Sequence, residues 1–137
     1  MTNAEEILKK AGVIRHGHFL LASGLHSPVY WEKFQVLQYP KYTEQLCKMI
    51  AEHFRDQKID LVAGPTTGGV ILAYEVARQL GVRGIFAEKT TTGARAFRRG
   101  FSIEPGEQGV GRRALRHRER EERALPQIGR ASCRERV

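Results

Sequence analysis

The sequence has 137 residues, enough for one modest domain with a buried core. It contains no secretory leader and no apolar run long enough to span a membrane, so we expect no membrane partner. Its two cysteines, Cys47 and Cys133, have neither metal-ligand spacing nor the pattern of a disulfide framework, which favours a reducing cytoplasm.

Charge divides the chain into two parts. The net charge is +8, which by itself suggests a nucleic-acid partner. Residues 1–108 carry 14 Lys and Arg against 11 Asp and Glu, whereas residues 109–137 carry 9 Arg, no Lys and 4 Glu. We therefore predict a domain over residues 1–108 and a foreign tail over residues 109–137.

The first part of the chain predicts two helices and two strands. Thr2–Glu5 (TNAE) has the pattern of a capping box, and it begins a short helix that ends near Gly12. Residues 18–22 and 29–34 are strand-like, and the turn SGLHSP joins them. A longer helix is expected over residues 40–55, because Pro40 suits a first helical turn. The apolar face of that helix consists of Leu46, Met49, Ile50 and Phe54.

The segment DLVAGPTTGGVILAYEVARQLG, residues 60–81, combines a strand, a tight loop and a helix. Residues 61–63 form a short apolar run, and the apolar spacing over residues 70–80 is helical, with Gly81 at the C-cap position. Backbone N–H groups and the positive end of the helix dipole meet at the loop, which favours an anion. The loop residues are Thr66, Thr67, Gly68 and Gly69, whose hydroxyls and absent side chains suit phosphate.

The loop alone leaves a second interpretation open. It lacks the Lys-Ser/Thr ending of a P-loop and the Gly-x-Gly-x-x-Gly pattern of a dinucleotide fold. An ordinary turn capped by threonine would have the same sequence, and both possibilities remain at this point.

The elements after this helix complete an α/β pattern. GIFAE, residues 84–88, is a strand that forms a right-handed βαβ unit with the segment before it. KTTTGARAFRRG is expected to be a polar, basic loop, and FSIEPGEQ a short strand and a turn that lead into another strand. Alternating strands and helices predict the α/β class.

Four segments carry a resemblance to a known family. In chain order they are GHFLLASGLHSPVYW, GPTTGGVILAYEVARQLG, FAEK and AFRRGFSIEPGE, which together span residues 17–107. They resemble orotate phosphoribosyltransferases, which have the type I phosphoribosyltransferase fold. The Ser-Gly-x-x-Ser-x-x-aromatic pattern is the most specific of these features. The resemblance implies a parallel sheet with flanking helices and a small N-terminal hood over residues 1–38.

The resemblance also implies a reaction. In this family, orotate and phosphoribosyl pyrophosphate give orotidine 5'-phosphate and pyrophosphate, a step of de novo pyrimidine (UMP) biosynthesis. Mg²⁺ is bound through the substrate phosphates and ribose hydroxyls, with no metal ligand expected from this chain. The resemblance further implies a cytoplasmic homodimer without a nucleic-acid partner.

Residue roles follow from matching positions. The catalytic candidates lie at the end of the strand at residues 84–88 and on the basic loop, which closes over the substrate in the family. They are Lys89, Arg95, Arg98 and Arg99. Thr66, Thr67, Gly68 and Gly69 correspond to the pyrophosphate loop, and Tyr30 and Trp31 to the orotate-contacting pair.

Several of these residues have structural alternatives. Tyr30 and Trp31 alternate across a strand, so Trp31 could be a core residue instead. Arg98 and Arg99 could form a solvated strand edge. Three histidines could suggest a metal site. We expect them to be surface or turn residues instead, since no Asp, Glu or Cys stands at metal-ligand spacing. They are His16, His18 and His26.

The sequence departs from the family in two ways. Some members carry lysine where this chain has Ala22 and Gly68, and both lysines would contact phosphoribosyl pyrophosphate. After EPGE the family continues into an apolar strand with two acidic residues and a Thr-Thr-Gly loop that holds the ribose 5-phosphate. Neither feature occurs in residues 109–137.

The sequence of residues 109–137 indicates that this tail is not native protein. Residues 128–137, IGRASCRERV, correspond to one reading frame of a common short-read sequencing adapter. With suitable codons for VGRRA and HREREER, the next frame spells Trp-Val-Val-Glu and Thr-Gly-Asn-Gly-Lys-Ser, which resemble the missing strand and phosphate loop. We therefore expect a frame shift followed by adapter read-through, and little transferase activity from the chain as written. The nucleotide sequence tests this expectation.

Two other functions remain as alternatives. One is another type I phosphoribosyltransferase that acts on a purine base, although the SGLHSPVYW segment argues against it. The other is nucleic-acid binding, either by a basic module that uses GRRALRHREREER, a segment without aromatic residues for stacking, or by a regulatory phosphoribosyltransferase homologue that binds RNA.

Overall fold

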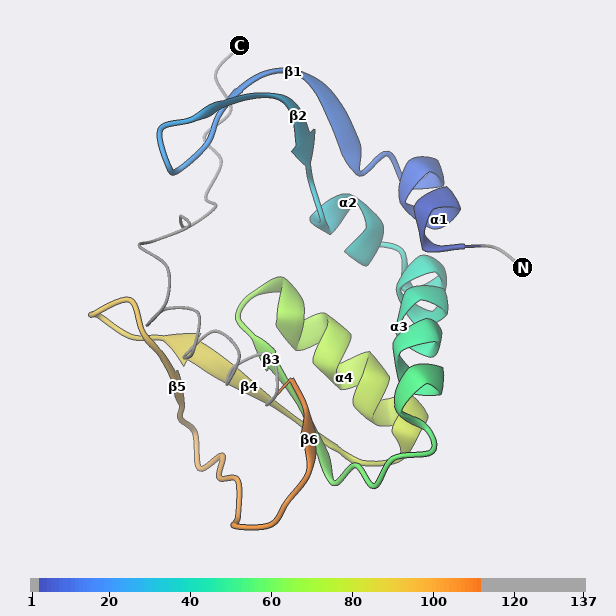
Figure 1. The fold of residues 1–137 in the computed structure, drawn as a ribbon, viewed down its shortest axis with the longest axis vertical. Helices are drawn as coiled ribbons and strands as arrows, with labels where there is room; N and C mark the ends of the chain where they lie inside the picture. Colours follow the sequence, from blue (N-terminus) through green and yellow to red (C-terminus); the bar gives the residue numbers. More distant parts are fainter. Residues whose placement is uncertain (1–2, 112–137) are drawn as a thin grey trace.

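A computed structural model describes residues 3–111 of the chain (Figure 1). Of the predicted foreign tail over residues 109–137, residues 112–137 lie outside this described part, and the origin of the tail stays a prediction. The helices are α1 (Ala4–Lys10), α2 (Phe34–Leu37), α3 (Pro40–Phe54) and α4 (Gly68–Leu80). The strands are β1 (Ile14–Leu20), β2 (His26–Trp31), β3 (Leu61–Pro65), β4 (Arg83–Lys89), β5 (Arg95–Phe97) and β6 (Gly109–Val110).

The N-terminal unit is α1 followed by an antiparallel hairpin of β1 and β2, which form a sheet of their own. The cap of α1 is Asn3, whose side chain accepts a hydrogen bond from the Glu6 amide at 2.9 Å, so the predicted capping box was one residue too early. The hairpin begins earlier than predicted, at Ile14. Phe34, predicted as the end of a strand, begins the short helix α2 instead.

The main sheet has the strand order β5-β4-β3-β6. β3 pairs in parallel with β4 and with β6, whereas β4 and β5 are antiparallel. The predicted α/β class and the parallel pair around α4 are therefore confirmed, but the sheet is mixed rather than wholly parallel. The reason is local: a tight turn after β4 sends the chain straight back as β5, and parallel strands cannot be joined by such a turn.

Helices α3 and α4 cover one face of the main sheet (Figure 1). Alternate residues of β3 point to opposite faces, so Val62 packs under the helices while Leu61 and Ala63 pack on the other side. The residues buried with Val62 are Cys47, Ala51, Ala73, Val76 and Ala77. The second face carries Ile85, against which Phe97, Phe101 and Ile103 pack.

Two expectations about the segment after β4 need correction. The predicted basic loop contains strand β5, and Phe97 anchors it to the core, so only its first part is a turn. Residues 101–108 form no strand, although the strand expected after them exists as β6. Gly109 and Val110, assigned to the tail from composition, therefore lie in the sheet beside Leu61 and Val62.

The segment between β5 and β6 is tied to β4 by one arginine. Arg83 donates to both carboxylate oxygens of Glu107, at 2.7 and 3.0 Å, and to the Ser102 carbonyl at 2.9 Å. Glu107 in turn accepts from the Glu104 amide at 2.8 Å. The hydrogen bond from Arg83 lowers the pKa of Glu107 below its ordinary value. This clamp is present above the usual carboxylate pKa and is lost as the pH falls through the lowered value.

We expect Arg83→Ala to speed hydrogen exchange at the Glu104 amide severalfold, because the acceptor of that amide loses its anchor. Amide exchange followed by NMR measures the effect. Arg78→Ala is the matched control, since Arg78 pairs with Glu75 and Glu44 on α4 and α3 instead. Equal exchange at Glu104 in both variants would show that the clamp does not order this segment.

Candidate functional site

The junction of β3 and α4 is the candidate anion site. Thr66 donates its amide to the Ala87 carbonyl of β4 at 2.9 Å, which fixes the loop against the end of the neighbouring strand. Helix α4 begins at Gly68, and its N-cap residue Thr67 makes no side-chain capping hydrogen bond. The threonine-capped turn left open by the sequence is therefore not what forms. The first amides of α4 and the positive end of its dipole remain directed at the loop.

The glycines of this junction allow a close backbone approach. A Cβ atom on Gly64 would clash with the carbonyl group of Gly69, and a Cβ on Gly69 would lie 2.5 Å from the Pro65 Cδ. No other residue type fits these two positions without a shift of the backbone. The sequence Gly-Pro-Thr-Thr-Gly-Gly thus folds the strand end and the helix start tightly together, so that backbone rather than side chains faces a ligand.

Arg95 reaches this loop from the β4–β5 hairpin. Its Nη1 donates to the Thr66 carbonyl at 2.9 Å and lies 2.8 Å from the Thr66 hydroxyl. Lys89, the last residue of β4, stands opposite Arg95 in the antiparallel register and is exposed. The structure therefore brings two predicted catalytic residues to the same end of the sheet as the loop.

The other two arginines are placed differently. Arg99 forms a bidentate pair with Glu88, with Nη2–Oε1 at 2.9 Å and Nε–Oε2 at 3.2 Å. That hydrogen bond lowers the pKa of Glu88 below its ordinary value. Arg98 is exposed beside this pair. Arg99 lies in the turn after β5 and pairs with a side chain of β4 rather than with the loop, so its catalytic role stays a prediction.

Tyr30 and Trp31 lie on β2, in the separate hairpin sheet. Trp31 is 55% exposed, so the alternative that it belongs to the core is wrong. Tyr30 is the inward one of the two: it is half-buried, and its ring centroid lies 5.6 Å from that of Phe19.

The three histidines are exposed, as expected. His18 and His26 contact each other across the hairpin, with Nε2 and Nδ1 2.5 Å apart. Within residues 3–111, no three His, Cys, Asp or Glu side chains are grouped so that they could hold a metal ion. The helices of this part are also too short or too polar to cross a membrane.

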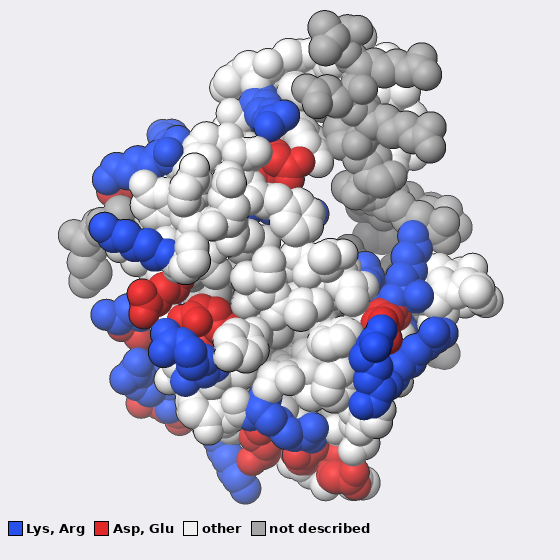
Figure 2. All heavy atoms as spheres, turned by 180° about the vertical axis from the view of Figure 1, so that it is seen from behind, with Lys and Arg blue, Asp and Glu red and all other residues white. Residues whose placement is uncertain are grey.

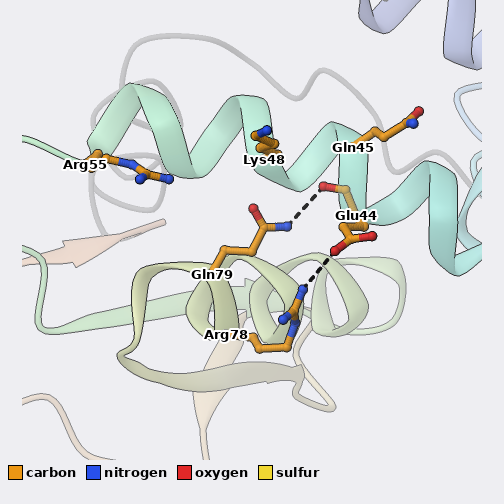
Figure 3. Close-up of a pocket in the computed structure, with 6 residues that line it drawn as sticks. All are labelled: Glu44, Gln45, Lys48, Arg55, Arg78 and Gln79. Atoms are coloured by element: carbon orange, nitrogen blue, oxygen red, sulfur yellow. Dashed lines mark hydrogen bonds and ion pairs between the residues drawn. The ribbon is translucent and has the colours of Figure 1, made fainter.

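A hollow of about 460 Å³ lies elsewhere, between α3 and α4 (Figure 3). Two hydrogen bonds cross it: Arg78 donates to the Glu44 carboxylate at 3.3 Å, and Gln79 donates to the Glu44 carbonyl at 3.0 Å. The lining is completed by Gln45, Lys48 and Arg55. Because Arg78 and Gln79 belong to the last turn of α4, this hollow is at the end opposite to the loop, and we do not regard it as the ligand site.

Sequence reasoning missed one residue near the loop. Lys33, which precedes α2, lies beside Gly68. No motif links these two positions, and only the packing of α2 against the start of α4 brings them together.

Comparison with known proteins finds relatives over about three quarters of this chain. No family model matches the chain. The orotate phosphoribosyltransferase of Thermoanaerobacter sp. (strain X514) is 52% identical over 102 residues, which cover 74% of this chain and 53% of that protein. The Thermus thermophilus enzyme of the same name is 40% identical over 103 residues, covering 75% of this chain and 56% of that protein. The matched part of this chain is homologous to the orotate phosphoribosyltransferases.

The chain spans about half the length of the curated relatives that it matches. Two solved structures support the type I phosphoribosyltransferase fold. UMP synthase of Leishmania donovani has a TM-score of 0.62 at 20% identity, over 85% of this chain and 27% of that one. Orotate phosphoribosyltransferase from Aeropyrum pernix has a TM-score of 0.53 at 23% identity, over 69% of this chain and 58% of that one.

Backbone amides and the helix dipole at this junction favour an anion, so inorganic pyrophosphate is a suitable probe for Arg95. We expect Arg95→Gln to weaken the binding of inorganic pyrophosphate about three- to tenfold, because the variant loses hydrogen bonds that hold Thr66 in place. Calorimetric titration measures the effect. Arg55→Gln, an exposed change at the end of α3, should leave the affinity unchanged. An Arg95→Gln variant that binds as tightly as the parent would contradict a role in ordering the loop.

Proposed function

We propose that the protein containing this chain is an orotate phosphoribosyltransferase, which transfers phosphoribosyl from phosphoribosyl pyrophosphate to orotate in pyrimidine biosynthesis. The observation that carries the proposal is the 52% identity to a curated enzyme of that name over 74% of the chain. The geometry is consistent with it, since a loop of Thr and Gly at the start of a helix suits a pyrophosphate leaving group.

In this proposal the leaving group and the sugar place different demands on the site. Pyrophosphate departs from the anomeric carbon while the sugar becomes oxocarbenium-like, so the site must stabilise a concentrated negative charge and exclude water. The amides of Thr67, Gly68 and Gly69 donate to phosphate oxygens, and Lys89 adds a compact positive charge. Tyr30 and Trp31 present aromatic faces to a flat, anionic pyrimidine.

Magnesium, location and assembly are further parts of the proposal. The loop offers N–H donors and hydroxyls, which suit phosphate oxygens rather than a cation, so Mg²⁺ would be held by the substrate phosphates and ribose hydroxyls and would neutralise part of their charge. We also propose a cytoplasmic homodimer. In this proposal Arg98 and Arg99 approach the substrate when the ion pair between Arg99 and Glu88 opens.

Nucleic-acid and purine-base alternatives are less favoured. On the face shown in Figure 2, the Lys and Arg side chains of the described residues are interspersed with Asp and Glu around an uncharged centre, unlike a continuous basic stripe. The exposed aromatic Trp31 follows the SGLHSPVY segment that resembles a pyrimidine-covering hood. The RNA-binding alternative was based on GRRALRHREREER, which apart from its first residue lies outside the described residues.

Binding measurements distinguish these functions. We would join residues 1–108 to the remaining C-terminal part of the Thermoanaerobacter sp. relative and titrate this chimera with orotate, adenine and a short RNA, each in the presence of Mg²⁺ and phosphoribosyl pyrophosphate. The proposal predicts saturable binding of orotate alone. Binding of RNA with a steep salt dependence would favour the regulatory homologue, and binding of adenine would favour the purine-type enzyme.

A further inference from the structure

The side chain of Lys33 lies beside the position from which a side chain on Gly68 would start. A Cβ atom on Gly68 would lie 3.1 Å from Cε and 3.3 Å from Cδ of Lys33, and 3.3 Å from Cδ1 of Leu37. Gly68 itself is buried. The aliphatic stem of Lys33 therefore lies directly over the first residue of α4.

The ammonium of Lys33 is at the surface beside this helix start. Lys33 is exposed, and its Nζ lies 4.9 Å from the centroid of the Phe34 ring. Among residues 3–111, no carboxylate lies within ion-pair distance of it. A lysine that covers apolar atoms with its stem and keeps its head in water has a short reach to any ligand at that surface.

The loop itself carries no charged side chain, since it consists of Thr66, Thr67, Gly68 and Gly69. The cations already placed near it, Arg95 and Lys89, both come from the β4–β5 hairpin. A cation held over Gly68 by the segment before α2 adds positive charge on the side of the loop where α4 begins. Charge-assisted hydrogen bonds are about twice as strong as neutral ones.

We propose that Lys33 is a binding residue for the pyrophosphate group, contributed to the loop by the segment between β2 and α2. This inference rests on the proposed function and adds a residue to its anion site. It also joins the two halves of the site, because Lys33 follows Trp31 by two residues. Pyrophosphate bound at Gly68 thereby fastens the end of the hairpin that bears Tyr30 and Trp31.

The test uses the 137-residue chain, inorganic pyrophosphate as the probe and calorimetry as the measurement. Lys33→Gln keeps most of the stem and removes the charge, and we expect about tenfold weaker binding from the loss of a charge-assisted contact. Lys48→Gln is the control with the same change of charge. Lys48 lies near Arg78 and Gln79, at the other end of α4, and its loss should leave the affinity unchanged (Figure 3).

A double variant places a lysine at residue 68 instead of residue 33. In Lys33→Gln combined with Gly68→Lys, the new side chain starts from the position that the Lys33 stem covers. The φ angle of Gly68 is not in the left-handed region, so a lysine can adopt it. We expect this double variant to recover most of the lost affinity. NMR shifts of the Gly68 and Gly69 amides on titration report whether the anion binds at the loop.

The possible results separate the two proposals. Parent-like affinity in Lys33→Gln, with the Gly69 amide responding to pyrophosphate, would overturn the role of Lys33 and leave the proposed function intact. A parent chain whose loop amides do not respond to pyrophosphate would contradict the proposed function, and the role of Lys33 with it. Weaker binding in Lys33→Gln without recovery in the double variant would contradict the proposal that a cation over Gly68 is what holds pyrophosphate.

Discussion

Gly64→Ala is expected to destabilise the chain by about 3 kcal/mol, because its Cβ would clash with the carbonyl of Gly69 and the added methyl would force strand and helix apart. Such a loss would lower the thermal midpoint by roughly 10 °C for a domain of this size. Circular dichroism during heating measures the midpoint. Loss of pyrophosphate binding should accompany the change, since the same backbone forms the anion loop.

Gly17→Ala is the matched control for this prediction. It adds the same methyl group, but at Gly17 the nearest atoms are the ring carbons of Phe19 at 3.4 Å, an ordinary contact distance. The midpoint of this control should stay within about 2 °C of the parent, as for most surface changes. If Gly64→Ala and Gly17→Ala have the same thermal midpoint, the close approach of Gly64 and Gly69 does not constrain this fold.

Lys89→Ala in the chimera is expected to lower kcat about 30- to 1,000-fold, which corresponds to about 2–4 kcal/mol of lost transition-state stabilisation. Lys89 ends β4 on the side of the sheet where the loop and Arg95 meet, and it is exposed rather than engaged in packing. Steady-state kinetics with orotate and phosphoribosyl pyrophosphate separate an effect on kcat from one on KM.

The control for Lys89 is Lys58→Ala. Lys58 is also exposed, but it precedes β3 and so lies at the opposite end of the parallel strands. Its replacement should leave kcat unchanged, and circular dichroism should show that both variants are folded. An unaltered kcat in Lys89→Ala would mean that this lysine is only a surface residue.

Local sequence signals predicted most of the fold. The helix over residues 40–55, the strand before Gly-Pro-Thr-Thr-Gly-Gly and the helix that ends at Gly81 were all expected and observed. In each case the signal is short-range: a proline at the first turn, a change of apolar period, and a glycine with φ of 70° at the helix end. The role of the loop as an anion site, inferred from the same local pattern, stays a prediction.

What could not be predicted depends on contacts between distant segments. β5 forms because Phe97 packs on the sheet beside Ile85. The polar residues around Phe97 gave this segment the sequence pattern of a loop. Arg99 turns to Glu88, eleven residues away in sequence. Lys33 meets Gly68 only through the packing of α2. Periodicity carries no information on such pairings, whereas the resemblance to a family gave the approximate positions of Lys89 and Arg95.

Formation of orotidine 5'-phosphate by the chimera that carries residues 1–108 tests the central claim most directly. Product chromatography after incubation with orotate, phosphoribosyl pyrophosphate and Mg²⁺ should show orotidine 5'-phosphate and an equal amount of pyrophosphate, and omission of orotate should abolish both. A folded chimera that binds neither substrate, or that forms a nucleotide from adenine but not from orotate, would contradict the assignment of this chain to orotate transfer.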